Sequence, residues 1–166
     1  MKSNTMATTE KQIWKVKSYY FLFFLSYAAI IPYLNLQFRQ AGLSAAEIGL
    51  VAACRPWVAA FASYAGPSVA DRLSAHRVCF IGAFAVSVLA RAVVALPVLH
   101  SGLFDPFWAI YASMVVSDAM FSICLVLADA AVISSLGDPL KYGQIRMWGS
   151  AGWGVMALGG GWVIAR

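Results

Sequence analysis

Residues 142–162 read YGQIRMWGSAGWGVMALGGGW, and this stretch decides the fold. It starts polar and becomes an apolar, glycine-rich segment with one arginine, Arg146, near its beginning. Placing an arginine where water is scarce costs free energy, so Arg146 at the start of an apolar helix needs a partner or a ligand. At about 3.6 residues per turn, Ser150 and Trp153 fall on the helix face of Arg146. A charge, a hydroxyl and an indole on one stripe favour a ligand-binding face.

A second stripe on the same predicted helix consists of small residues at spacings of four, three and four. Its members are Ser150, Gly154, Ala157 and Gly161. Small residues at such spacings let membrane helices approach closely. The pattern therefore predicts that this face packs against a neighbouring helix.

The composition of the whole chain is that of a protein dissolved in lipid. Of its 166 residues, 61% are hydrophobic and 11% are charged, an apolar excess that soluble domains do not show. We therefore predict an all-α integral membrane protein. The formal net charge of +5 arises from basic residues scattered singly between apolar runs, which excludes a nucleic-acid-binding patch. Cys54, Cys79 and Cys124 lie within apolar runs without metal-ligand spacing, so neither a metal nor another cofactor is expected.

Five apolar runs are long enough to cross a bilayer. They cover approximately residues 19–36, 45–70, 78–99, 106–135 and 142–165. Residues 1–17 are polar and are predicted to form a cytoplasmic tail. A signal peptide is disfavoured, because the first run is too long and aromatic and no cleavage site follows it. Residues 18–166 are then expected to form one partial helical bundle.

Basic residues near the predicted loops give the orientation. Eight of the twelve lysines and arginines lie on one side, namely Lys2, Lys11, Lys15, Lys17, Arg72, Arg77, Lys141 and Arg146. Arg39 lies on the opposite side. The positive-inside rule therefore predicts a cytoplasmic amino terminus. The expected location is the plasma membrane.

Three charged residues, Arg55, Arg91 and Asp118, fall well inside apolar runs. Each charge left alone at mid-bilayer would cost about 2.5–3.5 kcal/mol on insertion scales, so pairing or a wet cavity is expected. A structural pair of Arg91 with Asp118 is favoured, while Arg55 could instead face a central cavity. Small residues share the face of Arg55, so that a neighbouring helix can come close: Ala52, Ala59, Ala62 and Gly66.

The segment DRLSAHR at residues 71–77 joins two apolar runs and resembles the signature loop of the major facilitator superfamily. Asp71, Arg72 and Arg77 match that loop, while Pro67 and Ser74 stand where its pattern has glycine. Three further segments resemble one branch of the superfamily, which contains lactose permease, the nucleoside:proton symporters and the major facilitator superfamily domain-containing protein 6. These segments are IGLVAACRP at 48–56, VLADAAV at 126–132 and YGQIRMWGSAGWG at 142–154.

The resemblance implies five helices of the amino-terminal bundle of a twelve-helix transporter, with the remaining helices in a longer parent chain. It implies alternating access, a small polar solute such as a sugar or a nucleoside, and a proton as coupling ion. In the lactose permease group an acid late in the fourth helix and an arginine early in the fifth bind the sugar, and a tryptophan on the fifth stacks on it. Carried over, these become Asp129, Arg146 and Trp153, with aspartate here where the permease has glutamate.

Other interpretations stay open. Arg146 could be a positive-inside anchor, and Asp129 could be a structural latch for loop arginines. An organic anion is an alternative solute, because the buried arginines could bind its negative charge. A receptor or assembly protein built on a transporter scaffold is a different class. An intramembrane aspartyl protease is disfavoured, because Asp118 and Asp129 share one helix about 16 Å apart, too far to share one proton.

Overall fold

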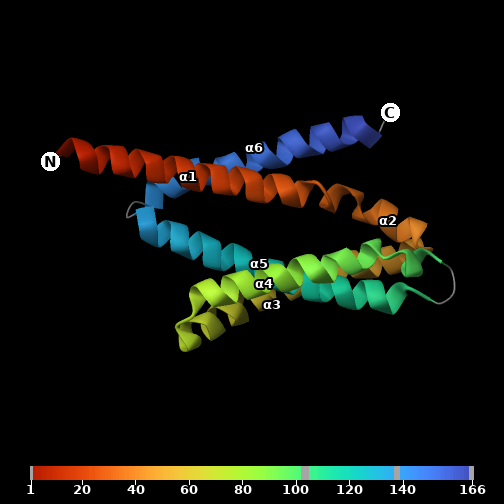
Figure 1. Ribbon diagram of the computed structural model, residues 1–166. Coiled ribbons are helices and arrows are strands. Elements are labelled where there is room, and N and C mark those ends of the chain that lie inside the picture. The colour runs from red at the N-terminus through yellow and green to blue at the C-terminus, as the bar shows by residue number, and fades with distance from the viewer. Residues whose placement is uncertain (1, 102–104, 137–138, 165–166) are drawn as a thin grey trace. The chain divides into compact units, whose positions relative to one another are not determined.

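The computed structural model describes residues 2–101, 105–136 and 139–164, and these are helical without any strand (Figure 1). The all-α prediction is confirmed. The elements in chain order are α1 (Lys2–Ala28), η1 (Ile31–Tyr33), α2 (Leu34–Gln40), α3 (Ala45–Leu73), α4 (His76–Ala92), η2 (Val93–Ala95), η3 (Pro97–His100), α5 (Phe107–Leu136) and α6 (Pro139–Ile164). The chain divides into two compact units, Met1–Leu34 with Val132–Arg166, and Asn35–Ala131.

Four stretches among the described residues are long and apolar enough to cross a membrane. They are Gln12–Gln40, Ala45–Leu73, His76–Ala95 and Phe107–Ser135. Helix α6 matches the fifth predicted run and has 26 residues, but it is not among these four. Its many glycines contribute little hydropathy. All five predicted runs are therefore helical, and four of them have the apolar character of a membrane span.

The first helix differs from the predicted span at both ends. It begins at Lys2, inside the segment expected to be a tail, and it ends at Ala28 rather than near residue 36. Pro32 explains the end, because proline has no N–H and its ring clashes with the carbonyl four residues earlier, here that of Ala28. The chain passes through η1 and resumes as α2.

The connection between α3 and α4 is shorter than the predicted loop 71–77. Asp71 and Arg72 complete the last turn of α3, and α4 begins at His76. Ser74 reverses the chain in the left-handed conformation, with φ of 49°, and its N–H donates to the carbonyls of Ala70 and Asp71. The tight turn thus forms with serine where the superfamily pattern has glycine.

The third helix also ends earlier than predicted. α4 stops at Ala92 and tightens into η2, after which Leu96 is extended with φ of −69° and ψ of 128°. A residue that precedes proline is disfavoured in the helical region, and Pro97 follows directly. Helix α5, by contrast, agrees with the predicted run within one residue.

In the first unit, α1 and α6 lie side by side, and glycines of α6 set their separation (Figure 1). A Cβ at Gly152 would collide with the Phe21 carbonyl oxygen, and a Cβ at Gly149 would lie 2.6 Å from the Phe24 ring. Nothing lies within 4 Å of a Cβ built at Gly154 or Gly161. The predicted small-residue stripe is therefore not the face that contacts α1. The contact uses Gly149 and Gly152, which lie outside that stripe.

In the second unit, α3 and α4 both pack against α5. A Cβ at Gly66 of α3 would collide with the Ile123 side chain of α5, so this face does bring a neighbouring helix close, as predicted. Between α4 and α5, the Ser87 hydroxyl donates to the Ser117 carbonyl and the Ser117 hydroxyl donates to the Ser87 carbonyl, each at 3.0 Å. Small residues at both crossings allow this approach.

Candidate functional site

Arg146, Ser150 and Trp153 line one pocket of about 250 Å³, together with Phe24 of α1. The three residues of α6 stand at i, i+4 and i+7, so helical periodicity places them on one face. Arg146 and Trp153 are half-buried and Ser150 is exposed. The pocket thus offers a cation, a hydroxyl and two aromatic faces to one small molecule.

Aromatic rings of α1 hold the guanidinium of Arg146. Its Cζ lies 4.6 Å from the Phe24 ring centroid and 5.3 Å from the Tyr20 ring centroid. Tyr20 is fully buried, in an apolar cluster with Ile145 of α6. Cation–π contacts of this kind contribute about 0.5–2 kcal/mol, more where water is excluded. The rings therefore fix the guanidinium at the pocket.

Trp153 lines the same pocket and contacts α1. Its ring lies 5.8 Å from the ring of Tyr27 on α1, tilted by 51°. Phe24 and Tyr27 are three residues apart on α1, so the two aromatic contacts with α6 come from one face of that helix. An aromatic wall beside polar donors is the usual composition of a site for a ring-bearing solute.

Asp129 belongs to the second unit and lies half-buried on α5. Arg146 belongs to the first unit. Their pairing across a solute, implied by the resemblance, therefore stays a prediction.

The three mid-span charges form one cluster. The Asp118 carboxylate accepts from Arg55 Nε at 2.5 Å through Oδ2 and from Arg91 Nη2 at 2.8 Å through Oδ1. Arg91 Nε also donates to the Ser117 hydroxyl at 3.0 Å. The Arg91 and Asp118 side chains are 8% and 6% exposed, and that of Arg55 is 29% exposed. The expected pair of Arg91 with Asp118 thus includes Arg55 as a second, more accessible cation.

The signature-loop residues lie at the α3–α4 turn. Asp71 lies 2.7 Å from His76 Nε2, with both side chains exposed. Arg72 is in the last turn of α3, and Arg77 is exposed in the first turn of α4. This segment caps and joins two helices and contributes no side chain to the pocket lined by Arg146.

Sequence reasoning missed the partners of Arg146 on α1. The signal was present, because Tyr20, Phe24 and Tyr27 repeat at intervals of four and three, matching the spacing from Arg146 to Ser150 and Trp153. Two stripes of equal spacing on different helices can face one another over two turns. Which pair of helices does so depends on packing, which local periodicity does not specify.

Comparison with known proteins agrees with the helical, membrane-embedded architecture. No solved structure matches the chain. The chain is 28% identical over 147 residues to the maltose permease of Geobacillus stearothermophilus, in a match that covers 87% of this chain and 36% of the permease. The chain therefore spans little more than a third of the length of this relative.

Residues 13–166 match the MFS_1 like family, and this stretch contains all the residues discussed above as candidate site residues. The match and the four apolar helices together show that the protein is an integral, multi-pass membrane protein. The chain therefore belongs to the MFS_1 like family, within the major facilitator superfamily.

Proposed function

We propose that the chain forms part of a secondary transporter whose solute binds in the pocket lined by Phe24, Arg146, Ser150 and Trp153. The main support for this site is that a guanidinium, a hydroxyl and an indole stand at i, i+4 and i+7 on α6 and line one pocket. In this family of membrane proteins, such a site would be exposed to alternate sides of the bilayer as helical bundles move.

The chemistry of the pocket suits a neutral solute with hydroxyl groups and a ring. The Arg146 guanidinium donates several N–H bonds, the Ser150 hydroxyl donates or accepts, and Trp153 offers an apolar face. A sugar or a nucleoside has these features. The related permease is named for maltose, which supports a sugar as the first solute to test.

Asp129 is proposed as the acceptor that complements Arg146 on the solute, and a proton as the coupling ion. Both assignments rest on the resemblance of the segments at 126–132 and 142–154 to the lactose permease branch. The amino terminus is proposed to be cytoplasmic, because basic residues concentrate on that side of the predicted loops.

An organic anion is less well supported as the solute. Both mid-span arginines, Arg55 and Arg91, donate to Asp118, so one of their two positive charges is offset inside the protein and both guanidinium groups are engaged by it. The cluster is therefore proposed to be a structural ion-pair network that ties α3 and α4 to α5.

Protection from alkylation tests the pocket directly. In a background with Cys54, Cys79 and Cys124 replaced by serine, Ser150→Cys places a thiol in the pocket, and Ala151→Cys places one on the exposed neighbouring position. Millimolar maltose or uridine should slow alkylation of the Ser150→Cys variant by N-ethylmaleimide severalfold and leave alkylation of the Ala151→Cys variant unaffected. Equal rates with and without both solutes in the Ser150→Cys variant would refute the site.

The role of Arg146 needs its own variant. Adding Arg146→Gln to the Ser150→Cys protein should abolish protection, whereas Arg77→Gln, which removes an exposed arginine from α4, should leave it intact. Trp153→Phe should shift protection to higher solute concentration. Unchanged protection in Arg146→Gln would mean that this arginine is only a membrane anchor.

A further inference from the structure

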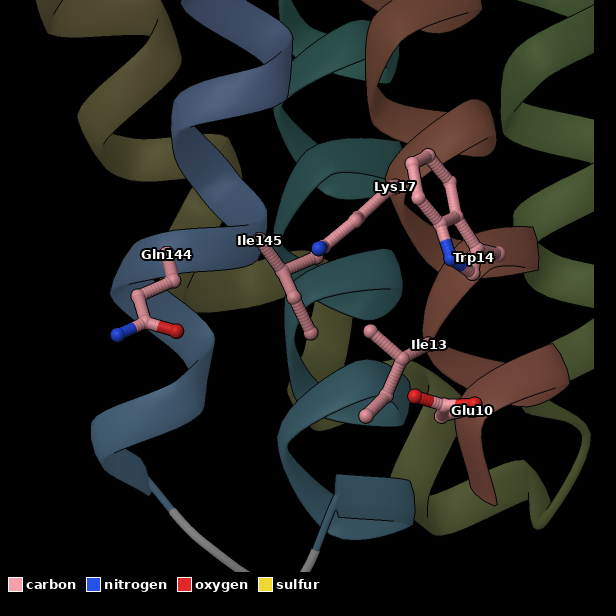
Figure 2. A pocket seen from close by; sticks show the side chains of 6 residues that line it. All are labelled: Glu10, Ile13, Trp14, Lys17, Gln144 and Ile145. Carbon is pink, nitrogen blue, oxygen red and sulfur yellow. The ribbon is translucent and has the colours of Figure 1, made fainter. Parts of the chain in front are cut away.

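A second pocket, of about 230 Å³, lies between α1 and α6 near the predicted cytoplasmic side. It is lined by Glu10, Ile13, Trp14 and Lys17 of α1 and by Gln144 and Ile145 of α6 (Figure 2). Figure 2 shows the two isoleucine side chains between the helices, with Glu10 and Lys17 of α1 on either side of Ile13. The candidate solute site shares none of these residues.

The ammonium of Lys17 is held in place by two indoles. Its Nζ lies 5.0 Å from the Trp14 ring centroid and 5.7 Å from that of Trp148 on α6. The two rings are themselves 5.7 Å apart in an edge-on arrangement. Because two indoles from two helices fix this cation, less conformational entropy is lost when it binds a ligand.

Glu10 brings an opposite charge to the same pocket without neutralising Lys17. The two residues are seven positions apart, about 10 Å along the helix axis. Within the described part of the chain, no ion pair joins Glu10 to Lys17. The Gln144 amide of α6 adds a donor and an acceptor to the lining. The lining is thus complementary to a ligand that carries both a negative and a positive group.

The position of the pocket indicates that this ligand is a lipid. It lies where the apolar stretch Gln12–Gln40 begins. Trp14 lies two residues after the start of that stretch, and Trp14 and Trp148 are 56% and 37% exposed. Exposed tryptophans where an apolar stretch begins are typical of the membrane–water interface. Ile13 and Ile145 give the pocket an apolar floor, and Ile145 is 1% exposed. The apolar stretch that begins at the pocket would lie beside the acyl chains of a lipid, which a water-soluble zwitterion lacks.

We infer that this pocket binds the headgroup of a zwitterionic phospholipid. Lys17 and Gln144 bind the phosphate, Glu10 faces the ammonium group, and the isoleucines contact the methylenes that join the phosphate to the ammonium group. A lipid without an ammonium group would leave the Glu10 carboxylate without a cationic partner, so it would bind through Lys17 and Gln144 alone. The inference concerns lipid binding and does not depend on the identity of the transported solute.

Native mass spectrometry of the purified chain in detergent tests the inference, with dioleoylphosphatidylcholine as the probe. Lys17→Gln and Glu10→Gln should each weaken binding about fivefold to tenfold, because each removes one charged contact. Lys15→Gln is the matched control, since Lys15 is exposed on α1 and does not line the pocket. Circular dichroism of each variant verifies that its helices are retained.

Two further arms separate the alternative ligands. Dioleoylphosphatidylglycerol should bind more weakly than the choline lipid, and glycerophosphocholine, the soluble headgroup, should not displace the lipid at equal concentration. Tighter binding of the glycerol lipid, strengthened by Glu10→Gln, would show an anion site instead. Displacement by glycerophosphocholine would show a site for a free zwitterion, and unchanged lipid binding in both pocket variants would refute the site altogether.

Discussion

At the scale of single residues, Asp118 has the largest consequences. One carboxylate receives both mid-span arginines, and its own side chain is 6% exposed. A buried charge that loses its partner stays uncompensated, which costs more than the pair itself contributes. The Asp118 carboxylate therefore stabilises two arginines on two different helices, Arg55 on α3 and Arg91 on α4.

Asp118→Asn should lower the free energy of unfolding by about 3–5 kcal/mol, because it leaves Arg91 buried without a carboxylate. Arg55→Gln should cost less, since the pair of Arg91 with Asp118 remains and Arg55 is 29% exposed. Unfolding by sodium dodecyl sulfate in mixed micelles, followed by circular dichroism, measures both. Equal losses in the two variants would contradict the proposed hierarchy.

Ser74 is a residue whose backbone decides its effect. With φ of 49° it occupies a conformation that favours glycine, at the residue that ends α3. Ser74→Gly should therefore stabilise the protein by about 0.5–1 kcal/mol.

Ser68→Gly supplies the matched control, because Ser68 is exposed in the interior of α3, where glycine should cost about 0.5–1 kcal/mol. The two substitutions should shift the same unfolding midpoint in opposite directions. Destabilisation by Ser74→Gly would show that the serine hydroxyl matters more than the backbone conformation.

At the scale of elements, the pairing of α1 with α6 depends on which glycines face the contact. A Cβ at Gly152 would meet the Phe21 backbone, which cannot rotate away, whereas a Cβ at Gly154 meets nothing within 4 Å. The same pairing brings the aromatic face of α1 against Arg146 and so forms the candidate solute pocket.

Gly152→Ala should consequently destabilise the protein by about 1–3 kcal/mol through overpacking. Gly154→Ala should be neutral or stabilising by up to about 1 kcal/mol, because alanine is the better helix former. Thermal unfolding in detergent compares the two. If both variants unfolded at the same temperature, the close approach of α1 and α6 would be wrong.

At the scale of the whole molecule, the bias of basic residues predicts that the α3–α4 turn lies on the cytoplasmic side and the connection before α5 on the other. Ser74 and Ser101 are both exposed and mark these two connections. In a cysteine-free background, Ser74→Cys and Ser101→Cys should react with an impermeant maleimide from opposite faces of oriented membranes. Reaction of both from one face would exclude the predicted topology.

Local patterns determined the elements of this protein. The apolar runs predicted the helices, since their length and composition suit a bilayer, and the spacing of Arg146, Ser150 and Trp153 predicted one helix face. The helix ends were harder to predict from the sequence, because they depend on the interruption of the helix at Pro32 and on the left-handed turn at Ser74. Local features of this kind change the folding free energy by only about 1–3 kcal/mol, and they leave the apolar pattern of the sequence unchanged.

The tertiary structure alone decided which residues from distant parts of the chain meet. Arg146 contacts the rings of Tyr20 and Phe24 near the other end of the chain, and Asp118 binds Arg55 as well as Arg91. Helix α1 packs on Gly149 and Gly152, which lie outside the small-residue stripe. Periodicity states which residues share a face but not which helix covers it. In lipid that choice follows from close packing and hydrogen bonds between helices, because the hydrophobic effect does not distinguish a helix from a lipid chain.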